Sequence, residues 1–101
     1  PTAVERPGGE SMEPKAFTLM PNYPNPFNPS TDSRFRISDP EFVILKIFDT
    51  LGREVATLVN EQRSAGVYTL RWDASNLPSG VYYYRLRAGG FFETKKMVLA
   101  K

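Results

Sequence analysis

From Thr31 onward, apolar residues recur at every second position, and this period of two most constrains the fold. Such alternation is typical of β-strands that bury one face. Gly, Pro, Asn and Asp interrupt it every 8 to 12 residues or so, as in antiparallel all-β domains. No stretch between the turns has helical spacing, so we predict an all-β fold, an antiparallel β-sandwich of about seven strands. The expected strands are Phe17–Met20, Arg34–Ile37, Phe42–Phe48, Glu54–Val59, Val67–Asp73, Val81–Ala88 and Phe91–Leu99.

The alternation also predicts which side chains face the core. The largest of them, Trp72, Tyr82 and Tyr84, are expected at its centre, because buried aromatic rings remove the most area from water. Gly52 and the Gly89-Gly90 pair are expected in tight turns, and residues 60–65 in a polar loop. The other predicted inward residues are Phe35, Ile37, Val43, Leu45, Ile47, Tyr68, Leu70, Leu86, Met97 and Leu99.

A proline-rich segment precedes the alternating region. It reads Asn22-Tyr23-Pro24-Asn25-Pro26-Phe27-Asn28-Pro29. Proline fixes φ, has no N–H, and pushes the preceding residue toward extended conformations. The segment therefore cannot be a helix or a central strand. We expect a stiff, extended strap that covers a sheet edge and is anchored by Tyr23 and Phe27, although a rigid, turn-rich connector is an alternative.

The first fifteen residues are polar, rich in Pro, Gly and Glu, and without hydrophobic period. We interpret residues 1–15 as a flexible linker or terminal extension and residues 16–101 as one domain. The sequence begins with Pro1 rather than Met, so we expect it to be a piece of a longer protein. A net charge of +2 gives no reason to expect nucleic acid, and no apolar run is long enough to span a membrane.

The residue types argue against catalysis. Without His or Cys, neither a Ser–His nor a Cys–His pair can form. Asp49 and Asp73 are the best pair of carboxylates, yet each closes a strand beside a turn, where capping explains it more simply. Asn25, Asn28 and Asp32 lack the spacing of a calcium loop. We therefore expect no cofactor and no metal.

Two surface features have alternative interpretations. Tyr83, Phe48 and Phe91 or Phe92 are expected on outer faces, where a contiguous aromatic patch would bind sugar rings. The last predicted strand is basic and amphipathic. Its lysines either protect a sheet edge from aggregation or form a tag that a partner reads by pairing with the edge.

Several motifs together resemble one family. They are "NYPNPFNPST" from Asn22 to Thr31, "DTLGREV" containing Gly52 and Arg53, Ala65-Gly66, Trp72-Asp73, "SGVYYYRL" containing Gly80, Tyr82 and Tyr84, and "KMVLAK" from Lys96 to Lys101. In this order and spacing they resemble a type A C-terminal sorting domain of the type IX (Por) secretion system. The Ig-like domain of the flagellar hook-capping protein has a similar pattern.

The resemblance implies a seven-stranded Ig-like or fibronectin III-like sandwich without catalytic activity, attached behind an N-terminal passenger domain. It implies passage through the periplasm, recognition by an outer-membrane translocon, cleavage by a sortase in or before residues 1–15, and release or attachment to anionic lipopolysaccharide at the cell surface. The recognition element implied by the family is Lys95, Lys96, Met97, Val98, Leu99 and Lys101.

Three residues depart from the family pattern: Ser33 replaces an apolar residue, Ser38 a frequent proline and Tyr68 a frequent histidine. They leave open whether this copy is a sorting signal or a structural Ig-like spacer of the same shape. A carbohydrate-binding module attached to a glycoside hydrolase is the other alternative, and it requires the aromatic patch.

Overall fold

The computed structural model describes residues 17–101, and this part of the chain forms an all-β sandwich without a helix. The predicted fold class is therefore confirmed. The linker expected in residues 1–15 lies outside the described residues. The strands are β2 (Thr18–Leu19), β3 (Ser30–Ile37), β4 (Glu41–Phe48), β5 (Glu54–Arg63), β6 (Gly66–Asp73), β7 (Gly80–Ala88) and β8 (Phe91–Leu99).

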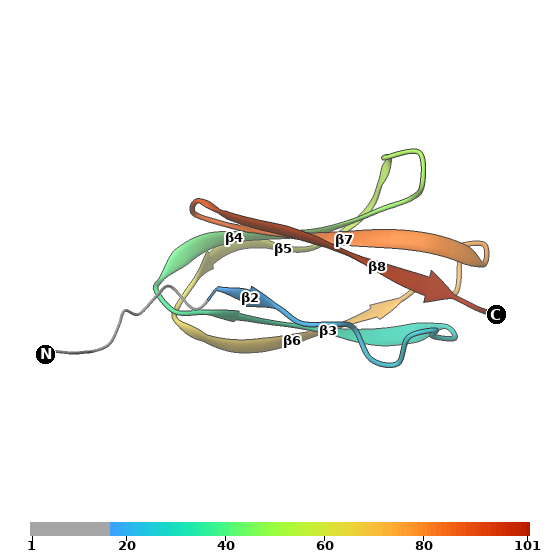
Figure 1. Cartoon of the computed structure of the whole chain (residues 1–101), viewed down its shortest axis with the longest axis horizontal. Coiled ribbons are helices and arrows are strands. Elements are labelled where there is room, and N and C mark those ends of the chain that lie inside the picture. Colours follow the sequence, from blue (N-terminus) through green and yellow to red (C-terminus); the bar gives the residue numbers. More distant parts are fainter. Residues whose placement is uncertain (1–16) are drawn as a thin grey trace, which may run out of the picture.

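Two antiparallel sheets form the layers of the sandwich (Figure 1). One has three strands in the order β2-β3-β6, and the other has four in the order β5-β4-β7-β8. β8 is thus an edge strand that pairs with β7 along its whole length, from Ala88 opposite Phe91 to Gly80 opposite Leu99. The pairing has no register shift, so the alternation of β8 continues unbroken to its end.

The core lies between the sheets and consists of the side chains that the alternation places inward. Trp72 packs edge-on against Tyr82, with ring centroids 5.7 Å apart, and against Phe27 at 5.8 Å. Tyr68 stacks on Phe35 at 5.3 Å at the opposite end of the three-stranded sheet. The core residues predicted from the sequence are all buried or packed against the buried cluster.

Tyrosine hydroxyls inside the sandwich are satisfied by backbone carbonyls. The Tyr82 hydroxyl donates to the Pro78 carbonyl at 2.7 Å, at the corner where the chain passes from β6 to β7. This resembles the tyrosine corner of Ig-like sandwiches, where the hydroxyl bonds to the backbone a few residues upstream. The Tyr84 hydroxyl donates to the Met20 carbonyl at 2.8 Å and so connects the two sheets.

Two strand boundaries differ from the prediction by more than one residue. β3 begins at Ser30 rather than Arg34, and β5 continues to Arg63, so the polar loop predicted for residues 60–65 is wrong over most of its length. In β5 these residues pair with the first half of β4, from Ile44 opposite Asn60 to Glu41 opposite Arg63. Backbone hydrogen bonds sustain an edge strand without apolar side chains, and composition alone therefore misleads there.

Candidate recognition surface

The proline-rich segment lies against the end of β8 and pairs with it, as the expected strap over a sheet edge requires. The Phe27 N–H donates to the Val98 carbonyl and the Ala100 N–H donates to the Phe27 carbonyl, both at 2.9 Å. Asn25 adds a third bond, because its side-chain Oδ1 accepts from the Val98 N–H at 3.0 Å. Three prolines remove N–H groups from this segment, which leaves the Phe27 N–H as a donor to β8.

Only one of the two predicted aromatic anchors is buried. Phe27 is 2% exposed and packs against Trp72, whereas Tyr23 is 80% exposed. The expectation for Tyr23 is therefore wrong: its backbone pairs with Asp32, but its ring extends into solvent. The anchor on that side is Asn22, a buried residue whose Nδ2 donates to the Thr31 Oγ1 at 2.9 Å.

The last residues of the sequence are fixed to the loop between β6 and β7. The Lys101 Nζ donates to the Ser75 carbonyl at 2.7 Å, and the Lys101 N–H donates to the Ser79 Oγ at 3.0 Å. The same loop meets the proline-rich segment, where the Ala74 N–H donates to the Pro29 carbonyl. Three distant parts of the sequence thus converge beside the end of β8, at the end of the sandwich marked C in Figure 1.

The residues implied as the recognition element are divided between two faces of β8. Met97 and Leu99 are each 1% exposed and belong to the core. Lys95 lies on the same inward side at the rim of the sheet, where it forms an ion pair with Glu93 at 3.3 Å. Lys96 is exposed and Val98 is half-buried on the opposite, outer face. The structure therefore does not bring the six residues into one patch.

Within residues 17–101, the outer edge of β8 is covered at one end only. The Val98 carbonyl accepts from Phe27 and the Val98 N–H donates to Asn25, so both backbone groups of Val98 point away from β7. Since the register is unbroken, the N–H and carbonyl groups of Phe92, Thr94 and Lys96 point the same way. No described residue pairs with them, so this half of the strand is an open sheet edge.

The outer face of β4, β7 and β8 combines aromatic rings with cations. The Arg85 guanidinium lies over the rings of Phe48 and Phe92, 4.8 and 5.1 Å from their centroids. Arg87 also lies over Phe92, at 5.9 Å. Cations therefore lie over two of the aromatic rings predicted here, and the rings of Phe48 and Phe92 do not form a bare stacking patch for a sugar.

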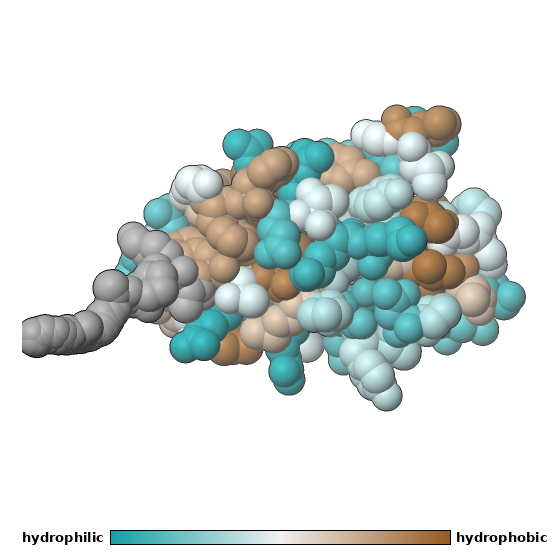
Figure 2. All heavy atoms as spheres, in the orientation of Figure 1, coloured by the Kyte–Doolittle hydropathy of each residue, from teal (hydrophilic) through white to brown (hydrophobic). Residues whose placement is uncertain are grey.

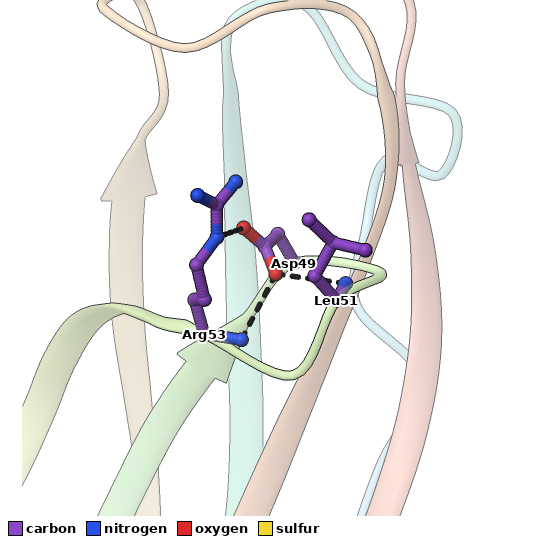
Figure 3. Close-up of polar contacts among 3 residues, drawn as sticks. All are labelled: Asp49, Leu51 and Arg53. Atoms are coloured by element: carbon purple, nitrogen blue, oxygen red, sulfur yellow. Dashed lines mark hydrogen bonds and ion pairs between the residues drawn. The ribbon is translucent and has the colours of Figure 1, made fainter.

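Beside this face, the turn between β4 and β5 is held by one carboxylate (Figure 3). The Asp49 Oδ1 accepts from the N–H groups of Leu51 and Arg53 at 2.9 Å, and Oδ2 accepts from the Arg53 Nε at 2.8 Å. Gly52 takes a φ of 82°, as predicted. These bonds, first that of the Arg53 N–H, lower the pKa of Asp49 from 3.8. The carboxylate is thus a turn cap, as predicted.

Asp73, the second candidate carboxylate, also caps a turn. Its Oδ1 accepts from the Ser75 hydroxyl and the Ser75 N–H, and these bonds lower its pKa. Asn25 and Asp32 are engaged with Val98 and Arg71. Within residues 17–101 there is no group of three or more acidic residues arranged to hold a metal ion. The same residues contain no helix long and apolar enough to cross a membrane.

Arg85, Arg87 and Thr94 were not among the residues singled out from the sequence. Their position on the outer face follows from the period of two, since they alternate with the inward Tyr84, Leu86 and the rim residues of β8. The signal that could have identified them is the pair of arginines at outward positions of "YRLR". Their contact with Phe48 and Phe92 depends on strand order and required the structure.

A family model described as the secretion system C-terminal sorting domain matches residues 22–100. The match begins at the buried Asn22 and includes the proline-rich segment and every strand from β3 to the covered end of β8. It therefore extends over most of the chain and nearly all of the described fold. The protein belongs to this family of C-terminal sorting domains, and the domain is a sorting signal for export through the type IX secretion machinery.

Proposed function

We propose that the type IX machinery recognises this domain in its folded form, through the solvent side of β8. The partners are the outer-membrane translocon and the sortase. Of the implied recognition residues, Lys96 and Val98 offer the side chains that a partner touches first. Met97, Leu99 and the ion-paired Lys95 act indirectly, because they keep the strand in place.

One observation supports this proposal most strongly. Met97 and Leu99 are 1% exposed, while Lys96, which precedes Met97 on the opposite face of the strand, is exposed. A partner that read Met97 or Leu99 directly would have to pull β8 out of the sheet and expose the core. Deleting buried side chains of this size costs about 2–5 kcal/mol each. Recognition of the exposed side avoids that cost.

The rest of the proposal concerns the route and the fate of the protein. The domain folds in the periplasm without disulfides, since the chain has no cysteine. It performs no chemistry itself, because its best-placed carboxylates, Asp49 and Asp73, are turn caps. The sortase cuts in or before residues 1–15, which connect the folded domain at residues 16–101 to the passenger. The passenger is then released or attached to anionic lipopolysaccharide at the surface.

A surface-charge reversal tests folded-state recognition. A fluorescent reporter fused to residues 1–101 is expressed in type IX-competent cells, and its export is measured for wild type and Lys96→Glu. Lys96 has no partner among the described residues, so the variant is expected to unfold at the wild-type temperature while its export falls at least about tenfold.

Arg36→Glu is the matched control, because Arg36 is an exposed strand residue of the other sheet. It makes the same charge change and is expected to leave export unchanged. Deletion of residues 95–101 is a poorer test, since it removes two core residues as well. Normal export of Lys96→Glu would contradict the proposal, as would an equal loss in both variants.

A further inference from the structure

The open part of β8 offers a partner unused backbone groups. The outward N–H and carbonyl groups of Phe92, Thr94 and Lys96 have no partner among the described residues. An exposed edge of this kind is a template for one more strand. Extended peptides bind such edges in many recognition domains, gaining affinity from main-chain hydrogen bonds and specificity from alternate side chains.

The face beside this edge is cationic. The outward side chains of β4, β7 and β8 contain Lys46, Arg85, Arg87 and Lys96 and no carboxylate. Lys46 is neutralised by Glu54 of β5, with Nζ and Oε1 3.0 Å apart. The other three cations form no ion pair within residues 17–101.

Arg85 is the cation best prepared for a ligand. The rings of Phe48 and Phe92 hold its guanidinium, and its Nε lies 3.5 Å from the Thr94 Oγ1 beside the open edge. A hollow of about 350 Å³ adjoins it, with Phe48, Tyr83 and Thr94 in its lining. A guanidinium fixed in this way loses little entropy when it binds, and its planar fork matches a carboxylate.

The nearby acidic groups do not fill this role. Glu54 is paired with Lys46, and Asp49, which lines the same hollow, is bonded to Arg53 and to two backbone N–H groups. A second copy of the chain is also a poor occupant. Pairing two β8 edges would bring two cationic faces together and oppose their charges.

We infer that the open edge of β8 accepts an extended acidic peptide segment as an added strand. Its main chain pairs with Phe92, Thr94 and Lys96, and its outward carboxylates meet Lys96 and the guanidinium of Arg85. This rests on the proposed function and gives the chemistry of the partner at the same surface. An apolar added strand is disfavoured here, because its inward side chains would bury the inward ion pair of Glu93 and Lys95.

Binding of short synthetic peptides to the whole chain tests the inference by calorimetry. The probe alternates glutamate and threonine, and a second peptide alternates lysine and threonine. The acidic peptide is expected to bind at least about tenfold more tightly than the basic one, with an affinity that falls as salt rises. Methylation of alternate backbone nitrogens, which removes the pairing groups but keeps the charges, is expected to abolish binding.

Two variants locate the site. Arg85→Gln and Lys96→Gln are each expected to weaken binding of the acidic peptide about tenfold, whereas Arg36→Gln on the other sheet leaves it unchanged. Thermal unfolding verifies each fold, and Lys96→Gln serves alone if Arg85→Gln is unstable.

If the methylated peptide bound as tightly as the unmethylated one, the inference would be overturned in favour of a simple anion site. If polygalacturonate bound more tightly than the acidic peptide, it would be overturned in favour of a polysaccharide ligand. Absence of peptide binding would also overturn the inference. In that case a loss of export in Lys96→Glu would still support the proposed function, so the two can fail separately.

Discussion

The two halves of β8 have the same strand geometry but opposite surroundings. At the covered end, Val98 and Ala100 bond to Asn25 and Phe27 of the proline-rich segment. In the open stretch, from Phe92 to Lys96, the corresponding backbone groups have no partner among the described residues. The covered end lies over the aromatic core around Trp72, whereas the open stretch ends at the exposed cation Lys96. The difference indicates that the proline-rich segment stabilises one half of an edge strand and leaves the other half available to a partner.

Surface hydropathy does not follow this division of β8. On the face seen in Figure 2, apolar residues lie toward both ends of the long axis, while hydrophilic residues extend across the middle. Surface apolar residues alone therefore do not mark the candidate site. The candidate site is marked instead by a backbone edge and neighbouring cations that have no partner among the described residues. Four predictions test the comparison between the two halves of β8.

The largest effect is expected from removing the anchor of the covered end. Phe27→Ala empties a site that is 2% exposed and should lower the free energy of unfolding by about 3–5 kcal/mol. Phe27→Leu should cost only about 1 kcal/mol. Tyr23→Ala, in the same segment but 80% exposed, should change stability by less than about 0.5 kcal/mol. Urea unfolding measures all three, and equal losses for Phe27→Ala and Tyr23→Ala would show that the segment is not anchored as described.

Amide hydrogen exchange compares the two halves directly. The N–H groups of Val98 and Ala100 have acceptors, and those of Phe92, Thr94 and Lys96 have none among the described residues. The free energy of opening that limits amide exchange ranges from almost zero at unbonded groups to the global free energy of unfolding at bonded ones. The amides of Val98 and Ala100 should therefore exchange about a hundredfold more slowly than those of the open stretch. Uniform exchange along β8, measured by NMR, would remove the distinction.

Tyr84 lies under the open stretch, opposite Lys95, and gives a pH-dependent test. Burial, with a contribution from the Glu93 carboxylate, raises its pKa from 10.0 to about 12. The unfolded chain therefore loses the phenolic proton first, and stability should fall as pH rises from 10 to 12. Tyr84→Phe should cost about 1 kcal/mol at neutral pH through the lost bond to Met20, and should remove this part of the alkaline dependence. Unchanged alkaline sensitivity in Tyr84→Phe would place its origin elsewhere.

The smallest effect is expected at Asn25. Its Oδ1 accepts the Val98 N–H near the surface, so Asn25→Ala should cost about 0.5–1 kcal/mol and speed exchange of that amide. Asn28→Ala is the matched control, because Asn28 also precedes a proline and is exposed without a bond among the described residues. If both changes have the same effect on the Val98 amide, the side-chain bond does not protect it.

Much of the sheet architecture could be predicted from local pattern. Residues such as Val43, Tyr82 and Met97 face the core because alternation in a strand is a local property. The end of β5 could not be predicted from local pattern, because Asn60 belongs to a strand only through its pairing with β4. The two aromatics of the proline-rich segment were indistinguishable in sequence, and only the position of Trp72 made Phe27 the anchor.

The sequence by itself determined the period of two, the turn residues, and the set of motifs that places the chain among the sorting domains. Tertiary structure decided which β8 residues are accessible, that β8 is an edge strand covered at one end, and that Arg85 lies between Phe48 and Phe92. The physical reason is distance along the chain. A strand's faces are set by neighbouring residues, whereas its edge and its surface partners are set by strands that pack beside it from remote parts of the sequence.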